Sequence, residues 1–564
     1  MHNPPNRSRR VAAAMGKEPS DVLLKNARAL DVFTLTWREC DVAIADGAVV
    51  GIGPRGDVPL AATRTVDLGG RAVVPGFIDA HVHVESSLLV PENFARVVVP
   101  KGTTTAICDP HEVANVVGVR GIETFLDAAE RMRDSLDLRV MISSCVPATH
   151  METNGAGVLS AAALSPLRAR RHALGLAEVM NVPGVIHGDP EVLAKLDAFE
   201  GTPIDGHCPL LRGRELSAYA AAGIRSCHES SELEEAREKL TNGISVWIRE
   251  GSVAKDLHAL SPLLTLETSI AMGFCTDDRN PLDIATEGHL DYLIRGAIAR
   301  GVRAEVAYRA ASLSVARHYG LRHLGAVAPG FDADLVVLDD VASCAVHQVF
   351  RRGVPASELA FPSLADKTGE GTMRAVVPPE SDLICPSGRV PLIGVRGGRI
   401  LTDHHVMNHD APGVARLTVL ERHGHGVPPA NGYAFGFGES FDGAIASSVG
   451  HDSHNLIVCG KTPRDMRVAL AALVEAGGGF VVVKGGAVSA LLPLPAFGLM
   501  SRQDPREIER ALLALRAASK AAGCVLAEPF LQLAFLSLPV IPSLKLTDRG
   551  LVDVEKFAII SVAA

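Results

Sequence analysis

Apolar and polar positions alternate regularly along the middle of the chain. From about residue 72 to residue 321, short apolar runs alternate with segments whose apolar residues recur at helical spacing. Such alternation is typical of a parallel sheet, and eight strand–helix units in about 250 residues fit a (β/α)8 barrel. A doubly wound open sheet is the alternative, but the sequence has no glycine fingerprint of a dinucleotide site. The predicted strands lie within residues 72–83, 103–110, 137–148, 174–180, 204–209, 224–230, 244–252 and 271–278.

The regions on either side show different patterns. Residues 21–71 contain short apolar runs separated by turn signals, and a β pattern returns in residues 322–370. Residues 371–564 mix strands with amphipathic helices. We therefore predict an α/β protein with a (β/α)8 barrel over residues 72–321, a flanking small β domain built from the segments before and after it, and a C-terminal mixed α/β domain. Residues 1–20 are expected to form a disordered arm.

The first predicted barrel strand ends in an unusual series of polar residues. Asp79, His81, His83 and Glu85 occupy every second position after an apolar run. Because residues two apart share one face of a strand, these side chains point the same way. They lie at the carboxyl end of the strand, where active sites of this barrel are found. Two imidazoles at this spacing can converge on a metal ion.

Other predicted strands end in the same manner. A single histidine at a strand end is more often a satisfied polar residue than a ligand, but here several occur together. Like charges gathered at one rim are costly unless a cation holds them, and mixed nitrogen and oxygen donors suit Zn, Mn or Fe better than Mg or Ca. We expect donors enough for two divalent ions. The predicted ligands are His81, His83, Glu178, His207, His228 and Asp277.

A second set of polar residues has two open interpretations. Glu85 and Ser86 either contact the substrate or cap the helix near Pro91. Asp109 either binds substrate with its neighbours or caps a turn, and Asp278 is either a support for Asp277 or a helix cap. The tract "SSVGHDSHN" is either a solvated loop or a second wall of the site. The candidate substrate-binding residues are Glu85, Ser86, Asp109, His111, Glu112, Asp278, His451, His454 and Asn455.

Composition excludes several classes of function. The net charge of −9 and the aromatic content of 4% argue against binding to a nucleic-acid backbone or to single strands. The ten cysteines are scattered without a CxxC pair, which indicates reduced thiols and a cytoplasmic location. No run reaches 18 apolar residues, so we expect no membrane span.

Several of these motifs together resemble a known family. "PGFIDAHVHVESS", the isolated strand-end histidines, the Asp277 position and "PGFDADLVVLDD" are similar to the amidohydrolase superfamily. Within it, "GTTTAICDPHEVANVVG", "DGHCP", "CHES", "IREGS" and "SSVGHDSHN" resemble the bacterial adenine deaminases. The resemblance extends from about residue 20 through the C-terminal region.

This resemblance implies a binuclear metal site. His81 and His83 match the first-strand pair, and His207, His228 and Asp277 match the ligands of strands 5, 6 and 8. Many relatives bridge their metals with a carboxylated lysine on strand 4, where this chain has Glu178; a buried ion pair with an arginine is the other role open to Glu178. The family resemblance favours Mn or Fe over Zn. We also expect a homo-oligomer, a dimer.

The resemblance further implies a reaction. A metal-bridged hydroxide would attack C6 of adenine, with Glu178 and Asp277 as catalytic residues and Asp277 as the proton shuttle, giving hypoxanthine and ammonia. Either Glu85 or Glu112 would protonate N1. Two alternatives remain at this point: a cyclic-amide hydrolase of the same superfamily, which would normally carry the strand-4 lysine, and a non-catalytic metal-binding scaffold.

Overall fold

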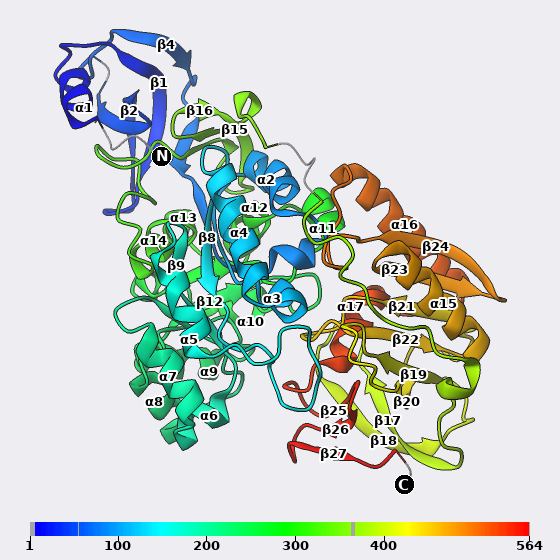
Figure 1. Ribbon diagram of the computed structural model, residues 1–564. Helices are drawn as coiled ribbons and strands as arrows, with labels where there is room; N and C mark the ends of the chain where they lie inside the picture. The colour runs from blue at the N-terminus through cyan, green and yellow to red at the C-terminus, as the bar shows by residue number, and fades with distance from the viewer. Residues whose placement is uncertain (1–5, 55, 363–366, 563–564) are drawn as a thin grey trace.

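The computed structural model describes residues 6–54, 56–362 and 367–562. Figure 1 shows an N-terminal β sheet, a central barrel with its helices, and a C-terminal α/β region beside the barrel. None of the helices within the described ranges is long and apolar enough to cross a bilayer.

The barrel is built from eight parallel strands in sequence order. Each strand pairs with the next, and a parallel bridge between Val82 and Asp277 brings the ends of the first and last strands together. The prediction of a (β/α)8 barrel is therefore confirmed. The strands are β6 (Phe77–Val82), β7 (Thr103–Cys108), β8 (Asp137–Ile142), β9 (Ala173–Val179), β10 (Ile204–Gly206), β11 (Ser226–Cys227), β12 (Ser245–Arg249) and β13 (Met272–Cys275).

Helices surround these strands and bury their apolar faces against them. In α4, for example, Ile122, Phe125 and Leu126 are fully buried at helical spacing, which drives the helix onto the barrel. The barrel helices are α2 (Pro91–Val98), α3 (His111–Val117), α4 (Val119–Met132), α5 (Ala161–Leu164), α6 (Val182–His187), α7 (Pro190–Ala198), α8 (Gly213–Ala221), α9 (Leu233–Thr241), α10 (Leu257–Leu260), α11 (Pro281–Thr286), α12 (Leu290–Ala299), α13 (Ala304–Ala310) and α14 (Leu313–His318).

The N-terminal sheet combines segments from both sides of the barrel. Its strand order is β16-β15-β14-β5-β1-β2-β3, and β4 pairs with β1. One expectation needs correction: the apolar run of residues 72–83 is not one strand, because it divides at Gly76 into β5 of this sheet and β6 of the barrel. The strands are β1 (Ser20–Asp31), β2 (Thr36–Ala45), β3 (Ala48–Gly53), β4 (Ala62–Asp67), β5 (Ala72–Pro75), β14 (Leu335–Asp340), β15 (Ala345–Arg351) and β16 (Val354–Pro355).

The expected disordered arm also differs in the structure. Residues 1–5 lie outside the described residues, but α1 (Arg7–Ala14) is helical and starts at an Asn6 side-chain cap. Arg9 pairs with Asp21 and Arg10 pairs with Asp46, so the helix is held against the sheet by charge. Ordering therefore comes from partners at a distance, which the short apolar run of the arm does not reveal.

The C-terminal region contains an eight-stranded sheet of order β18-β17-β20-β19-β22-β21-β23-β24 and a small antiparallel sheet of three strands. Helices α15 (Pro463–Ala476), α16 (Pro505–Ala521) and α17 (Pro529–Ala534) complete it. The strands are β17 (Arg389–Val395), β18 (Thr402–Asn408), β19 (Val414–Leu420), β20 (Ala430–Phe435), β21 (Ala444–Ser447), β22 (Leu456–Gly460), β23 (Gly479–Lys484), β24 (Ala487–Pro493), β25 (Leu544–Thr547), β26 (Gly550–Asp553) and β27 (Ala558–Ile560).

The C-terminal region meets the barrel at the loops that follow its strands. A parallel bridge joins Leu89, after β6, to Ser501. The Thr153 amide, after β8, donates to Asp548 at 2.9 Å. The carboxyl ends of the barrel strands therefore face this region, and a site at that rim has walls from both.

Candidate active site

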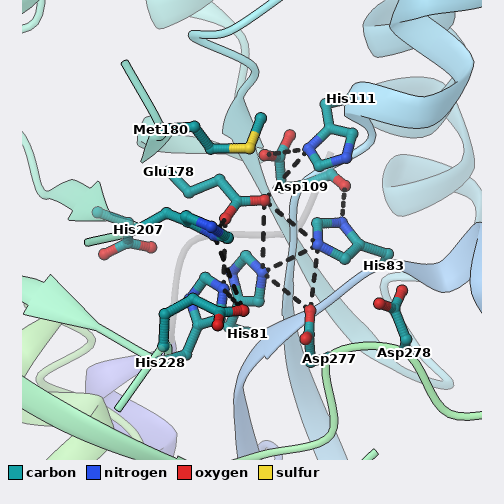
Figure 2. A network of polar contacts seen from close by, with 12 residues as sticks. His81, His83, Asp109, His111, Glu178, Met180, His207, His228, Asp277 and Asp278 are labelled. Carbon is teal, nitrogen blue, oxygen red and sulfur yellow. Dashed lines mark hydrogen bonds and ion pairs between the residues drawn. The ribbon is translucent and has the colours of Figure 1, made fainter. Parts of the chain in front are cut away.

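His81 and His83 bring their imidazoles to one point at the end of β6. Their Nε2 atoms lie 3.1 Å apart, and both residues are buried. The His83 Nδ1 atom lies 3.0 Å from the main-chain oxygen of Asp109, which fixes the ring (Figure 2). The period-2 pattern of the sequence therefore produces the convergence that it predicts.

Glu178, at the end of β9, is the centre of the site. Its Oε1 atom lies 3.3 Å from His83 Nε2 and 3.2 Å from His111 Nδ1. Its Oε2 atom lies 2.8 Å from His207 Nδ1 and 3.3 Å from His228 Nε2. Burial raises the pKa of this carboxyl, but His207 and the other histidines outweigh burial and hold the pKa well below its usual range. One anionic group is thus shared by several imidazoles (Figure 2).

Asp277 closes the opposite side of the cluster. Its Oδ1 atom lies 3.2 Å from His83 Nε2 and 3.6 Å from His81 Nε2, while its Oδ2 atom accepts from Arg249 Nη1 at 3.1 Å. Burial raises the pKa of Asp277, but His83, His228 and Arg249 together keep it well below its usual range. Its φ of 52° is left-handed, and main-chain bonds to His81 and His83 maintain it. The backbone is constrained so that this carboxylate faces the imidazoles.

The donor set fits divalent metal ions. Imidazole nitrogens and carboxylate oxygens converge in overlapping groups whose ligand atoms lie within 4.8 Å of one another, and every member is buried. A cluster of this kind, with a lone pair on each imidazole and two shared carboxylates, is a typical metal centre. The structure brings together all six residues that the sequence predicts as ligands: His81, His83, Glu178, His207, His228 and Asp277.

His111 and Asp109, two of the candidate substrate-binding residues, lie in direct contact with the cluster or with each other. The His111 Nδ1 atom is 3.1 Å from Asp109 Oδ2 and 3.2 Å from Glu178 Oε1. The other Asp109 oxygen accepts from Ser143 Oγ at 2.6 Å. Asp109 thereby orients His111 against the shared carboxylate.

Three candidate acids gather beside the cluster. Ser86 Oγ lies 2.9 Å from Glu112 Oε1 and 2.5 Å from Asp278 Oδ1. Glu85 Oε1 accepts from the Val113 amide at 3.2 Å. Burial, together with the charge of Glu112, raises the pKa of Glu85 to about 8. Glu85 is therefore protonated at neutral pH and can donate a proton.

The tract "SSVGHDSHN" comes from the loop between β21 and β22 and reaches this rim. Asp452 Oδ1 lies 3.5 Å from His451 Nδ1 and 3.7 Å from His111 Nε2. His454 lies 3.8 Å from Glu112. Asn455 has a different environment, because its amide nitrogen donates to the Thr153 carbonyl and to Asp548, while its oxygen accepts from the Arg422 amide. These bonds join the two regions.

A cavity opens above the cluster. His83, Glu178 and Asp277 line its polar side. The His451 ring stacks on Phe535 with centroids 4.9 Å apart and planes at 14°. The apolar side of the cavity is formed by Met180, Ala254, Ile400, Phe535, Leu538 and Ile541. One charged side and one apolar side suit a small molecule that has both polar and apolar surface.

Several residues of this site were not predicted from the sequence. Glu229 lies 3.9 Å from His207 Nδ1 and 3.8 Å from His228 Nε2, and it also pairs with Arg249. Glu229 lies in "CHES" and Arg249 lies in "IREGS". Both tracts end predicted strands, so the sequence already indicated that these two residues lie at the rim of the barrel. The apolar wall gave no comparable signal.

Comparisons with known proteins agree with this geometry. Residues 72–357 match the model of the amidohydrolase family, and residues 399–558 match that of the adenine deaminase C-terminal domain. An adenine deaminase of Methylobacterium sp. (strain 4-46) is 50% identical, with 98% of this chain and 99% of that protein covered. An adenine deaminase of Sinorhizobium fredii is 49% identical, with 98% of each chain covered. The chain therefore belongs to the amidohydrolase family, in the branch formed by the adenine deaminases.

Proposed function

We propose that this protein hydrolytically deaminates adenine to hypoxanthine and ammonia. The observation that carries the proposal is the buried histidine cluster around Glu178, which opens into a cavity with one apolar wall. Relatives named adenine deaminase along nearly the whole chain support the choice of substrate. A cyclic-amide hydrolase is not favoured, because position 178 at the end of β9 holds a glutamate in place of lysine.

Two divalent ions, Mn or Fe, are the cofactors that we propose. His81, His83, Glu178, His207, His228 and Asp277 would hold them, with Glu178 between the two positions. The mixed nitrogen and oxygen donors support a first-row transition metal, and the family resemblance supports Mn or Fe over Zn. When bound, such ions lower the pKa of a coordinated water, so that a nucleophile is available near neutral pH.

Asp277 is the residue proposed to move the proton. Its low pKa keeps it ionised, so it can accept a proton from the attacking water. Arg249 holds its Oδ2 atom and leaves Oδ1 directed at His81 and His83. From that position Asp277 would pass the proton to the leaving amine at C6.

A second acid must protonate the ring at N1. Glu85 is protonated at neutral pH, and Glu112 also has a raised pKa, for which burial is the main cause. Both lie at the edge of the cluster, and either can serve. The wall from the C-terminal region would hold the flat purine against these groups and exclude water.

The test is a screen of free bases and nucleosides for ammonia release by Mn-loaded protein. We expect ammonia from adenine in strong preference to adenosine, and release slower by about 10²-fold or more from the Asp277→Asn variant. Hydrolysis of cyclic amides without ammonia from adenine would reject the proposal.

We further propose that the protein is a homodimer and is located in the cytoplasm. Sedimentation analysis would detect the dimer.

A further inference from the structure

A second group of buried ligand-type side chains lies where the barrel meets the C-terminal region. Glu112 is on α3, and His451 and His454 are on the loop between β21 and β22. Their ligand atoms lie within 4.8 Å of one another. Each residue is at most 3% exposed. We refer to these three residues as the interdomain cluster; none is among the six proposed ligands of the barrel site.

The interdomain cluster holds polar atoms without partners among the described residues. Glu112 Oε2, His451 Nε2 and both ring nitrogens of His454 have no hydrogen bond. A buried polar atom left unpaired costs about 1–3 kcal/mol. Three such residues facing one another therefore indicate a missing partner.

The charge around the cluster indicates what that partner is. The Ser86 hydroxyl faces both Glu112 and Asp278, yet it has one proton and can donate to one of them at a time. Acceptor oxygens thus outnumber protons around Ser86, and buried carboxylates in excess are stabilised by a cation.

We propose that the interdomain cluster is a third divalent-cation site, with Glu112, His451 and His454 as ligands; Glu112 is then an ionised carboxylate, and Glu85 is the acid left to protonate N1. His451 Nδ1 lies 4.0 Å from Glu112 Oε1, and His454 Nε2 lies 3.8 Å from Glu112 Oε2. Ligand atoms around an ion at about 2.1 Å are about 3.0–3.4 Å apart, so each of these two Glu112–histidine pairs needs to contract by about 1 Å or less to hold an ion. Two imidazoles and one carboxylate suit Zn, Mn or Fe.

An ion at this position would join the two regions of the protein. Glu112 belongs to the barrel, and both histidines belong to the C-terminal region. Asp452, between the histidines in sequence, lies 3.7 Å from His111 of the barrel site. The third ion would therefore fix the loop that carries His451 over the cavity, and its binding would stabilise the folded protein.

Metal analysis of purified full-length protein tests this inference independently of adenine turnover. Protein expressed in Mn-supplemented medium should contain about three ions per chain, and His454→Ala should retain about two. His404→Ala is the matched control, because His404 is exposed on β18 of the same region, and it should retain three. Two ions per chain in the wild-type protein, or an equal content in His454→Ala and wild type, would overturn the inference.

Glu112→Gln is a second test variant, for use if His454→Ala fails to fold. Glutamine keeps the shape of the side chain and removes its charge. Anomalous scattering at the Mn edge from wild-type crystals should show a peak between Glu112 and His454. Peaks confined to the barrel cluster would contradict the proposal. Failure of adenine turnover with three ions present would reject the proposed function and leave this inference standing.

Discussion

Histidines of the barrel rim and histidines of the C-terminal loop have opposite environments. In the barrel, several imidazoles face one carboxylate, Glu178, at 2.8 to 3.3 Å. In the loop, His454 has no hydrogen bond to either ring nitrogen among the described residues. The barrel thus contains a complete donor set within one domain, whereas the loop needs the barrel to complete its own. Under the proposed function, the barrel carries the chemistry and the C-terminal region forms part of the cavity wall.

Glu178→Gln should produce the largest effect, because it removes the charge that the barrel imidazoles share. Metal affinity should fall by about 10²-fold or more, and activity should be lost with it. Elemental analysis after dialysis measures the loss. Glu92→Gln is the matched control, since Glu92 is a buried carboxylate paired with Arg131 away from the cluster; equal metal loss in both variants would contradict a central role for Glu178.

Asp277→Asn should separate metal binding from proton transfer. We expect this variant to keep much of its metal and to lose about 10²-fold or more in kcat, as when a general base is removed. Kinetics on metal-loaded protein with measured occupancy provide the check. If Asp277→Asn loses as much metal as Glu178→Gln, the two carboxylates have the same role and the assignment fails.

Phe535→Ala tests the C-terminal region alone. Because Phe535 stacks on His451 and lines the cavity, its loss should raise KM for adenine by about 5–10-fold with unchanged metal content. Phe535→Tyr should restore most of the affinity. Phe557→Ala, at an exposed position, is the control. An unchanged KM in Phe535→Ala would show that Phe535 does not contribute to substrate binding.

Lys545→Met should produce the smallest effect, on stability alone. Burial lowers the pKa of Lys545 to about 7, while its Nζ donates to the carbonyls of Ile400 and Phe535, which line the cavity. The unfolded chain keeps the ordinary value near 10.5. Between these values the unfolded state binds the extra proton, so this residue makes the protein less stable as pH falls from about 10.5 to 7.

The melting temperature of Lys545→Met relative to wild type should therefore be higher at pH 7 than at pH 10. Lys556→Met serves as the control, because Lys556 pairs with Asp553 at the surface. A difference between Lys545→Met and wild type that does not change with pH would show that Lys545 is charged in the folded protein.

Local patterns account for most of what the sequence predicted. The barrel and its six candidate ligands follow from strand–helix alternation and from residues at every second position, which are properties of short segments. Glu229 and Arg249 lie in the same tracts but received no role, because their partners come from neighbouring strands. The helix of residues 7–14 depends on ion pairs with Asp21 and Asp46, which no local pattern encodes.

The C-terminal contribution could be predicted only in part. For the tract containing His451, the sequence left a solvated loop and a second wall of the site both open, and the structure brings His451 and Asp452 to the cavity. Asn455 belongs to the same tract, yet its amide is used by Thr153, Asp548 and Arg422. Phe535 and Ile541 approach the cavity from a segment more than 250 residues from the barrel ligands at β13, and apolar residues carry no sequence signal for such a contact.

Stepwise addition of Mn to metal-free protein, followed by ammonia release from adenine, tests whether the Glu178 cluster carries the reaction. Activity should appear with Mn, depend on occupancy of the Glu178 cluster, and be absent in Glu178→Gln at every Mn concentration that saturates the wild type. Equal ammonia release by metal-free protein and Mn-loaded protein, or full activity in Glu178→Gln, would contradict this expectation.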